Sequence, residues 1–205
     1  MWAHEWDILL FALGDKQGVA KTLDKVRLYL RDQYNLVNNN ELAFVWITDF
    51  PFYEYDEGSE SWDFGHNPFS HVVGWVESLQ NLTHDEIQTN QYDLTLNGYE
   101  ILSWSIRNHD PEVMIAAFEK LGMSEADVKG RFWAMYEAFQ YGCPPHGGFA
   151  FGFDRLMMIL RDEPNIRECY AFPKSGRAQD VMMQAPSRLD DEQLKELSIS
   201  VIDHE

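Results

Sequence analysis

Residues suited to chemistry gather in one glycine-rich run, residues 147–156, which reads GGFAFGFDRL. The glycines permit close approach of another backbone or a ligand, and Arg155 falls at the start of the helix expected to follow. A cation is electrostatically disfavoured at that end of a helix unless an anion or an aromatic ring compensates it. An anionic ligand would do so, as would a carboxylate of the chain such as Glu100 or Asp154. The residues alone leave a ligand site and an internal ion pair both open.

The strands that would position this run are predicted from composition and alternation. Residues 42–52, LAFVWITDFPF, have the apolar, β-branched and aromatic composition of a buried strand, which Pro51 should end or place at an edge. Residues 92–96 alternate, so Asp93 and Thr95 share one face. Residues 62–69 and 149–153 are also predicted strands. Residues 70–90 show no clear period and are predicted to form a loop with one helical turn.

The helices are indicated by apolar spacing and by capping residues. Pro111 fits the first turn of a helix over 112–121 that Gly122 would stop, and Ser124 with Asp127 forms a variant capping box for the next helix. Further helices are predicted over residues 15–34, 156–160 and 190–197. This order of elements favours an α+β fold, an antiparallel β-sheet flanked by helices, with residues 1–205 as a single domain.

Composition narrows the function classes. The chain has 205 residues, 45% of them hydrophobic, which is typical of a globular protein, and a net charge of -18 that opposes nonspecific binding to nucleic acid. No phosphate-binding glycine motif of the P-loop or dinucleotide type is present, and no signal or membrane segment is indicated. Cys143 and Cys169 form no C-x-x-C pair, so a cytoplasmic location is expected.

Several segments carry a resemblance to a known family. The run GGFAFGFDRLMMIL resembles motif 3 of class II aminoacyl-tRNA synthetases, and FQYGCPPHGG before it has the form found in the aspartyl enzymes. Further matching segments follow the family's order: FVWITDFPFYEYDE, HNPFS, QYDLTLNGYEI, SIRNH and IRECYAFPKSGRAQDVMMQAPS. Collinear matches over roughly residues 15–197 are far more specific than one motif. The chain therefore resembles the C-terminal part of the catalytic domain of bacterial-type aspartyl-tRNA synthetases.

The resemblance implies a role for each matching residue. Arg155 would pack on ATP and neutralise it as a catalytic residue, with Gly152 and Asp154 beside it at the nucleotide. Glu100 would be a second catalytic residue that holds the Mg2+ bound to ATP. The remaining substrate-binding residues are Arg107, which would pair with the side-chain carboxylate of aspartate, and His66, on a loop over that pocket. ATP and Mg2+ are the implied cofactors, and aspartate and tRNA the implied partners.

The spacing of Glu100 and Arg107 sets a geometric condition on these roles. Residues seven apart on a regular strand point to opposite faces of a sheet. Only a bulge or turn at residues 102–105 would bring the two side chains to one face.

The sequence also departs from the family. Nothing in it resembles motif 1, motif 2 or the anticodon-binding barrel, so about half of the active-site sheet is expected to have no counterpart. Trp104 stands where the family has small residues and would add a large ring to the amino-acid pocket, and Trp75 lies in a segment where the family carries a Pro-Lys pair.

Two functions stay open on these grounds. One is an enzyme fragment that retains ATP or aspartate binding. The other is a binding or structural module, a natural paralogue or an engineered variant, that keeps the fold and has lost the reaction. Clustered aromatic replacements could also be buried in a homodimer through an interface different from the family's own.

Overall fold

The computed structural model describes residues 4–5, 7–38 and 40–202, and the chain divides into two compact units, Met1–Ala43 and Phe44–Glu205. The first unit contains one helix, α1 (Lys16–Gln33), among its described residues. Its N-cap is Asp15, whose carboxylate accepts a hydrogen bond from the Gly18 backbone N–H at 2.8 Å. The predicted helix over residues 15–34 is confirmed. The expectation that residues 1–205 form one domain stays a prediction.

The second unit is built on a four-stranded antiparallel sheet with the order β1-β6-β7-β8. Its strands are β1 (Phe44–Ile47), β6 (Gln91–Leu96), β7 (Tyr99–Ile106) and β8 (Gly147–Phe151). The fold class, an α+β arrangement of an antiparallel sheet and flanking helices, is confirmed.

The predicted buried strand over residues 42–52 is wrong in length and in burial. It is divided into β1 and the short strand β2 (Phe50–Pro51), because Asp49 has a left-handed φ of 61° between them. All four side chains of β1 are exposed, since β1 is the edge strand and pairs only with β6. The apolar composition of β1 therefore reflects strand propensity and not burial, whereas Phe52, at the end of the predicted segment, is buried.

β6 and β7 form a hairpin that sequence reasoning missed. Asn97 and Gly98 connect them with φ values of 50° and 87°, as a two-residue hairpin of type I′ requires. An Asn-Gly pair between apolar segments is the signal that would have found it.

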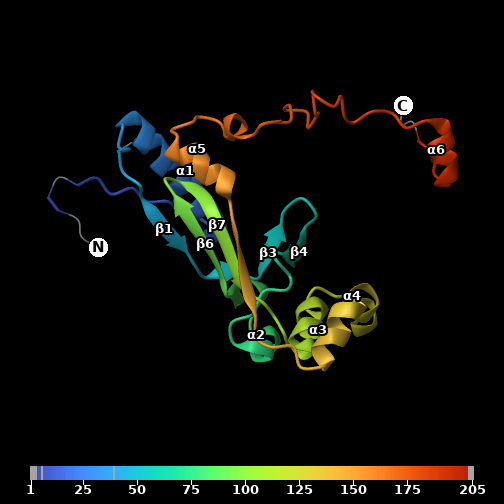
Figure 1. The fold of residues 1–205 in the computed structure, drawn as a ribbon. Helices are drawn as coiled ribbons and strands as arrows, with labels where there is room; N and C mark the ends of the chain where they lie inside the picture. Colours follow the sequence, from blue (N-terminus) through green and yellow to red (C-terminus); the bar gives the residue numbers. More distant parts are fainter. Residues whose placement is uncertain (1–3, 6, 39, 203–205) are drawn as a thin grey trace. The chain divides into compact units, whose positions relative to one another are not determined.

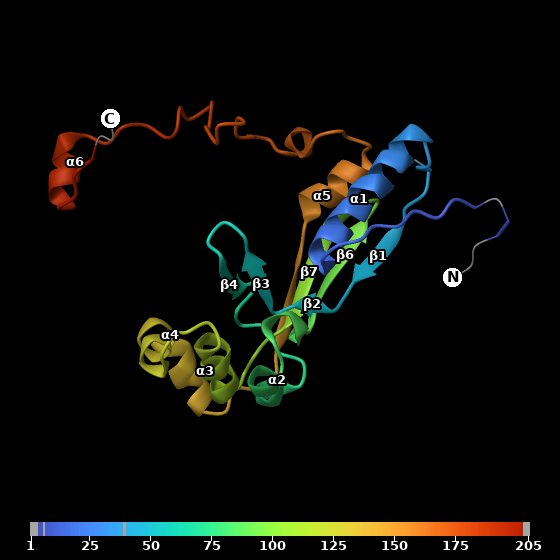
Figure 2. The same ribbon diagram turned by 180° about the vertical axis from the view of Figure 1, so that it is seen from behind.

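Three helices gather at one end of the strands, as Figures 1 and 2 show from opposite sides. They are α2 (Trp75–Asn81), α3 (Pro111–Glu119) and α4 (Glu125–Gln140). The predicted caps are confirmed: the Ser124–Asp127 capping box is present, and Gly122 has a φ of 84° at the end of α3. The predicted loop over residues 70–90 contains α2 as well as the short elements η1 (His84–Glu86) and β5 (Gln88–Thr89).

The buried core of this unit lies between these helices and the hairpin of β3 (Tyr53–Asp56) and β4 (Ser61–Phe64). Two clusters form it. The first contains Phe52, Tyr53, Val72, Leu79, Ile87, Val113 and Ala117, and the second contains Met114, Phe118, Val128 and Phe139.

The chain after β8 continues through α5 (Phe153–Leu160), η2 (Ile166–Cys169) and α6 (Asp191–Glu196), which confirms the predicted terminal helix. Within the described ranges, no helix combines the length and apolar character needed to cross a membrane.

Candidate active site

A bulge in β7 decides which candidate residues share a face of the sheet. Leu94 pairs with Leu102 and Thr95 pairs with Glu100, which leaves Ile101 as the extra residue. The bulge therefore lies one residue before the expected segment 102–105. It places Glu100 on the same face as Ser103, Ser105 and Arg107, which line that face of β7 roughly 20 Å from end to end.

Trp104 points to the other face. Its ring lies 6.0 Å from that of Tyr92 and 6.4 Å from that of Phe149, its cross-strand partners in the sheet. Alternation along β7 turns this ring away from the face that carries Arg107, yet Trp104 is among the residues that line the cavity of Arg107, so the expectation that its ring enters the amino-acid pocket stays a prediction.

Trp75, in contrast, lies outside the cavities of Arg107 and Arg155. Its ring packs edge-on against His71 and His109, at 4.6 and 5.3 Å. Burial lowers the pKa of His71, and the charge of His109 lowers it further.

Arg155 lies beside Glu100 at one end of this face. Its guanidinium donates a hydrogen bond to the Glu100 carbonyl oxygen at 2.7 Å and lies 3.7 Å from the carboxylate. Both side chains are about half exposed, so this ion pair is weak and leaves the arginine available to a ligand. An internal ion pair and a ligand site at Arg155 are therefore compatible.

A cavity of about 440 Å³ opens beside this pair. Among the residues that line it are Tyr99, Met158, Asn165 and Ile166, together with Glu100 and Arg155. Gly152 and Asp154 are not among its lining residues. Gly152 instead ties α5 to the bulge, because its N–H donates to the Ile101 carbonyl oxygen at 2.7 Å. Asp154 lies beside Tyr170, whose pKa its negative charge raises.

Arg107 lines a second cavity of about 440 Å³ at the other end of the face. The structure brings His66 to the same cavity, because the loop that follows His66 is bonded to the end of β7. The His71 N–H donates to the Ile106 carbonyl and the Asn108 N–H donates to the Phe69 carbonyl, both at 2.8 Å. His66 and Arg107 are therefore close, while Glu100 and Arg155 line a separate cavity.

The Arg107 guanidinium has no acceptor among the described residues, although the side chain is half-buried. Partial burial of a cation without a partner costs free energy, and a planar guanidinium is suited to a carboxylate that binds it through two hydrogen bonds. This arrangement could accept an anion.

The floor of this cavity is polar and was not foreseen from the sequence. Gln91 and Ser105 are cross-strand partners that are 7% and 6% exposed, and both line the cavity. Gln91 donates a hydrogen bond from Nε2 to the Thr89 hydroxyl at 2.9 Å, whereas the Ser105 hydroxyl has no partner among residues 4–5, 7–38 and 40–202. Small residues at 148 and 150 complete the floor. Gly147, just before them, lies so close to β7 that a Cβ atom would be 3.0 Å from the Ser105 carbonyl oxygen.

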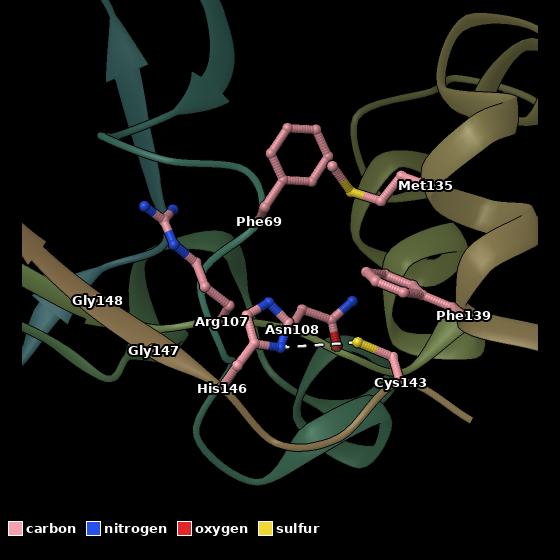
Figure 3. A pocket seen from close by; sticks show the side chains of 9 residues that line it. All are labelled: Phe69, Arg107, Asn108, Met135, Phe139, Cys143, His146, Gly147 and Gly148. Atoms are coloured by element: carbon pink, nitrogen blue, oxygen red, sulfur yellow. Dashed lines mark hydrogen bonds between the residues drawn. The ribbon is translucent and has the colours of Figure 1, made fainter. Parts of the chain in front are cut away.

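A third cavity of about 570 Å³ adjoins the second, and Arg107 and Gly148 border both. Its other walls include Phe69, Met135 and Phe139, which face one another in Figure 3. Cys143 Sγ lies 3.7 Å from His146 Nδ1, and the Arg107 side chain extends away from that pair (Figure 3). His146 Nδ1 is also 3.0 Å from the Pro144 carbonyl, to which it can donate, so the thiol contact is the weaker one.

Comparison with known proteins identifies the family of the chain. Residues 15–176 match the model of the tRNA synthetases class II (D, K and N). The chain belongs to this family. The chain is 48% identical over 193 residues to the aspartate–tRNA(Asp/Asn) ligase of Rhizobium rhizogenes, covering 94% of this chain and 32% of that protein. It is 45% identical over 196 residues to the enzyme of the same name from Agrobacterium fabrum, covering 96% and 33%.

Among solved structures, the aspartyl tRNA synthetase from Entamoeba histolytica has a TM-score of 0.49 and 20% identity, covering 88% of this chain and 29% of that one. The chain spans about a third of the length of the curated relatives it matches.

Proposed function

We propose that this chain is the part of an aspartate–tRNA ligase that binds aspartate and ATP for the formation of aspartyl-adenylate. The observation that carries the proposal is the bulge at Ile101. It turns Glu100 to the face of Arg107, so that an elongated ligand can contact both ends of one strand. Residues 147–160 would be class motif 3, and motifs 1 and 2 would not be represented in these 205 residues.

Arg107 is the residue proposed to bind the side-chain carboxylate of aspartate. It is half-buried and has no acceptor among the residues that the structure describes, and His66 lies at the same cavity as the residue proposed to cover the substrate. A guanidinium holds a carboxylate in a fixed plane, which orients the rest of the amino acid along the strand.

Arg155 and Glu100 are proposed to bind the nucleotide end of the ligand. Arg155 is a delocalised cation suited to the charge and rings of ATP, and the hydrogen bond to the Glu100 carbonyl fixes its position. Gly152 would act through its bond to the bulge, and Asp154 through its place in the first turn of α5.

Mg2+ fits Glu100 only as a metal that ATP itself helps to hold. No cluster of three or more His, Cys, Asp or Glu suitable for a metal occurs in the described part of the chain, so Glu100 would supply one carboxylate. Mg2+ is commonly held by one or two carboxylates with phosphate oxygens and water. When bound, it would neutralise phosphate charge, and the chain's own residues would supply position and orientation.

tRNA is a proposed partner whose contacts would be made mainly outside this chain. The net charge of -18 repels a polyanion, and 16 basic residues are scattered along the sequence. A cytoplasmic location is proposed with it, in keeping with the free thiols of Cys143 and Cys169.

Calorimetric titration of the chain with ATP and Mg2+, with and without aspartate, tests the proposal. Saturable binding is expected, and Arg155→Ala should abolish it. Arg161→Ala is a matched control, because Arg161 is an exposed arginine just after the same helix and does not line the cavity. A folded chain that binds neither ligand, or one in which both substitutions act alike, would contradict the proposal.

A self-associating binding module is the second candidate, and the other face of the sheet favours it. Trp46, Trp104, Phe149 and Phe151 share that face by register and are 40–66% exposed. An apolar surface of this kind marks an interface. Light scattering at high micromolar concentration should show a dimer that Phe149→Ser weakens and Tyr141→Ser, at an exposed aromatic on another surface, does not. A strictly monomeric mass would exclude this candidate.

A further inference from the structure

We propose that the Ser105 hydroxyl donates a hydrogen bond to the α-carboxylate of the amino-acid substrate and so acts as a further substrate-binding residue of the site. The inference rests on the proposed function and goes beyond it, because it assigns a second ligand group to Ser105, a residue of the matching segment SIRNH to which no role was given above.

The first argument is the state of the Ser105 side chain. It is 6% exposed, and its buried hydroxyl oxygen has no hydrogen-bond partner within the part of the chain that the structure describes. A buried hydroxyl that lacks a partner carries an uncompensated desolvation cost. Ser105 lines the cavity of Arg107, so a ligand in that cavity can supply the missing partner.

The second argument is direction along β7. Arg107 would hold the side-chain carboxylate of aspartate, and the α-carboxylate must point toward the nucleotide, because it is the group that attacks ATP. The nucleotide residues Glu100 and Arg155 lie on the Glu100 side of Arg107. Ser105 is the next residue on the same face in that direction, about 6–7 Å from Arg107 along the strand.

The neighbouring polar residues do not compete for this role. Gln91, opposite Ser105, donates one of its two Nε2 hydrogens to Thr89, which holds its amide group toward that residue. Ser103 lies on the same face but is exposed, so water satisfies its hydroxyl. Ser105 is the buried donor at this point of the cavity that has no other bond.

Two ligands separate the proposed contact from its neighbours. L-aspartate has both carboxylates, whereas 3-aminopropanoate keeps the side-chain carboxylate and the amine but lacks the α-carboxylate. Dissociation constants for both should be measured by NMR titration of the full chain. Ser105→Ala is expected to raise the dissociation constant of L-aspartate by about tenfold, which corresponds to the loss of one hydrogen bond to a charged group. The same substitution should change the dissociation constant of 3-aminopropanoate less than twofold. Arg107→Ala should weaken both ligands.

Ser70→Ala is the matched control. Ser70 is also fully buried with an unpartnered hydroxyl, and it does not line this cavity. Its loss should leave both dissociation constants unchanged. In the absence of ligand, Ser105→Ala should not lower the melting temperature, because it removes a hydroxyl that makes no bond in the free protein.

Each other outcome overturns the inference. An equal loss for both ligands, or a lowered melting temperature, would show a structural role, and unchanged affinity for L-aspartate would show no contact. If the unchanged chain binds neither ligand, the proposed function fails and the inference fails with it. If both ligands bind but Ser105→Ala does not selectively weaken the binding of L-aspartate, the proposed function stands and only the inference is overturned.

Discussion

The helical end and the sheet of the second unit differ in how they are stabilised. Around α3 and α4, side chains such as Met114, Phe118 and Val128 are at most 4% exposed. In the sheet, every residue of the edge strands β1 and β8 is exposed. Among the proposed binding residues, Glu100 and Ser105 lie on β7 and Arg107 follows it directly, whereas the two larger buried clusters lie at the helical end. Stability and binding are therefore carried by different residues, and substitutions should separate them.

The segment between His66 and Val72 links the two regions. Phe69 packs on Phe118 and Phe132 at the helical end, while the backbone of Ser70 bridges Arg107 in the sheet. Val72 is 1% exposed in the first core cluster. Through this segment the helical core fixes the backbone that carries Arg107.

The largest expected effect is a loss of stability from a substitution at the helical end. Phe118→Ala should lower the free energy of unfolding by about 3–5 kcal/mol, because a buried ring in contact with Phe64, Phe69 and Phe132 is lost. Phe149→Ala, which removes a ring that is 66% exposed, should change it by about 0.5 kcal/mol or less. Urea denaturation checks both, and equal effects would contradict the proposed separation.

Much of the helical end could be predicted from the sequence because its signals are local. Asp110 caps α3 by accepting from the N–H groups of Glu112 and Val113, and Ser124 caps α4. Glycine at 122 and 142 adopts the positive φ that ends each helix. Each signal depends on residues within a few positions, so one sequence suffices to read it.

The site geometry could not be read in the same way. The bulge at Ile101 depends on pairing with β6, and the face of Glu100 relative to Arg107 depends on that bulge. The exposure of β1 depends on its place at the sheet edge, which composition does not record. The roles of Arg107 and Glu100 could be suggested only by family resemblance, and the resemblance gave no reason to consider Ser105.

The second expected effect is on binding without a change in stability. Arg107→Ala should weaken aspartate binding by about 1.5–3 kcal/mol, the value of hydrogen bonds to a charged group. The free energy of unfolding should change little, because the guanidinium has no acceptor among the described residues. Calorimetry and urea denaturation of the same variant test this, and a large loss of stability would mean that Arg107 has a structural partner.

A smaller effect tests a single bond within the core. The Tyr53 hydroxyl donates to the Ala117 carbonyl at 2.7 Å, and burial raises the pKa of Tyr53, so the hydroxyl stays protonated. Tyr53→Phe should lower the free energy of unfolding by about 1–2 kcal/mol, because the buried carbonyl loses its donor. Tyr55→Phe, at an exposed position of the same strand, is the control. Unchanged stability of Tyr53→Phe would show that another donor reaches Ala117.

The smallest effect concerns pH and the segment that links the two regions. His71 Nδ1 lies 2.8 Å from the Asn90 amide nitrogen, which donates to it only while that ring nitrogen is unprotonated. Burial lowers the pKa of His71 from its ordinary value of 6.5, and His109, across the Trp75 ring, adds to the effect. The unfolded chain therefore binds more protons than the folded chain as pH falls below 6.5.

The contribution of neutral His71 to the stability of the fold is fully present above pH 6.5. It is lost as the pH falls from 6.5 toward the lower pKa that His71 has in the folded chain. Melting temperatures between pH 7.5 and pH 5 should accordingly decline less in His71→Gln than in the unchanged chain. His109→Gln should reduce the decline by a smaller amount, because burial is the larger cause of the shift. A decline of the same size in all three proteins would mean that this acid sensitivity arises elsewhere, and that protonation of His71 does not disturb the backbone that carries Arg107.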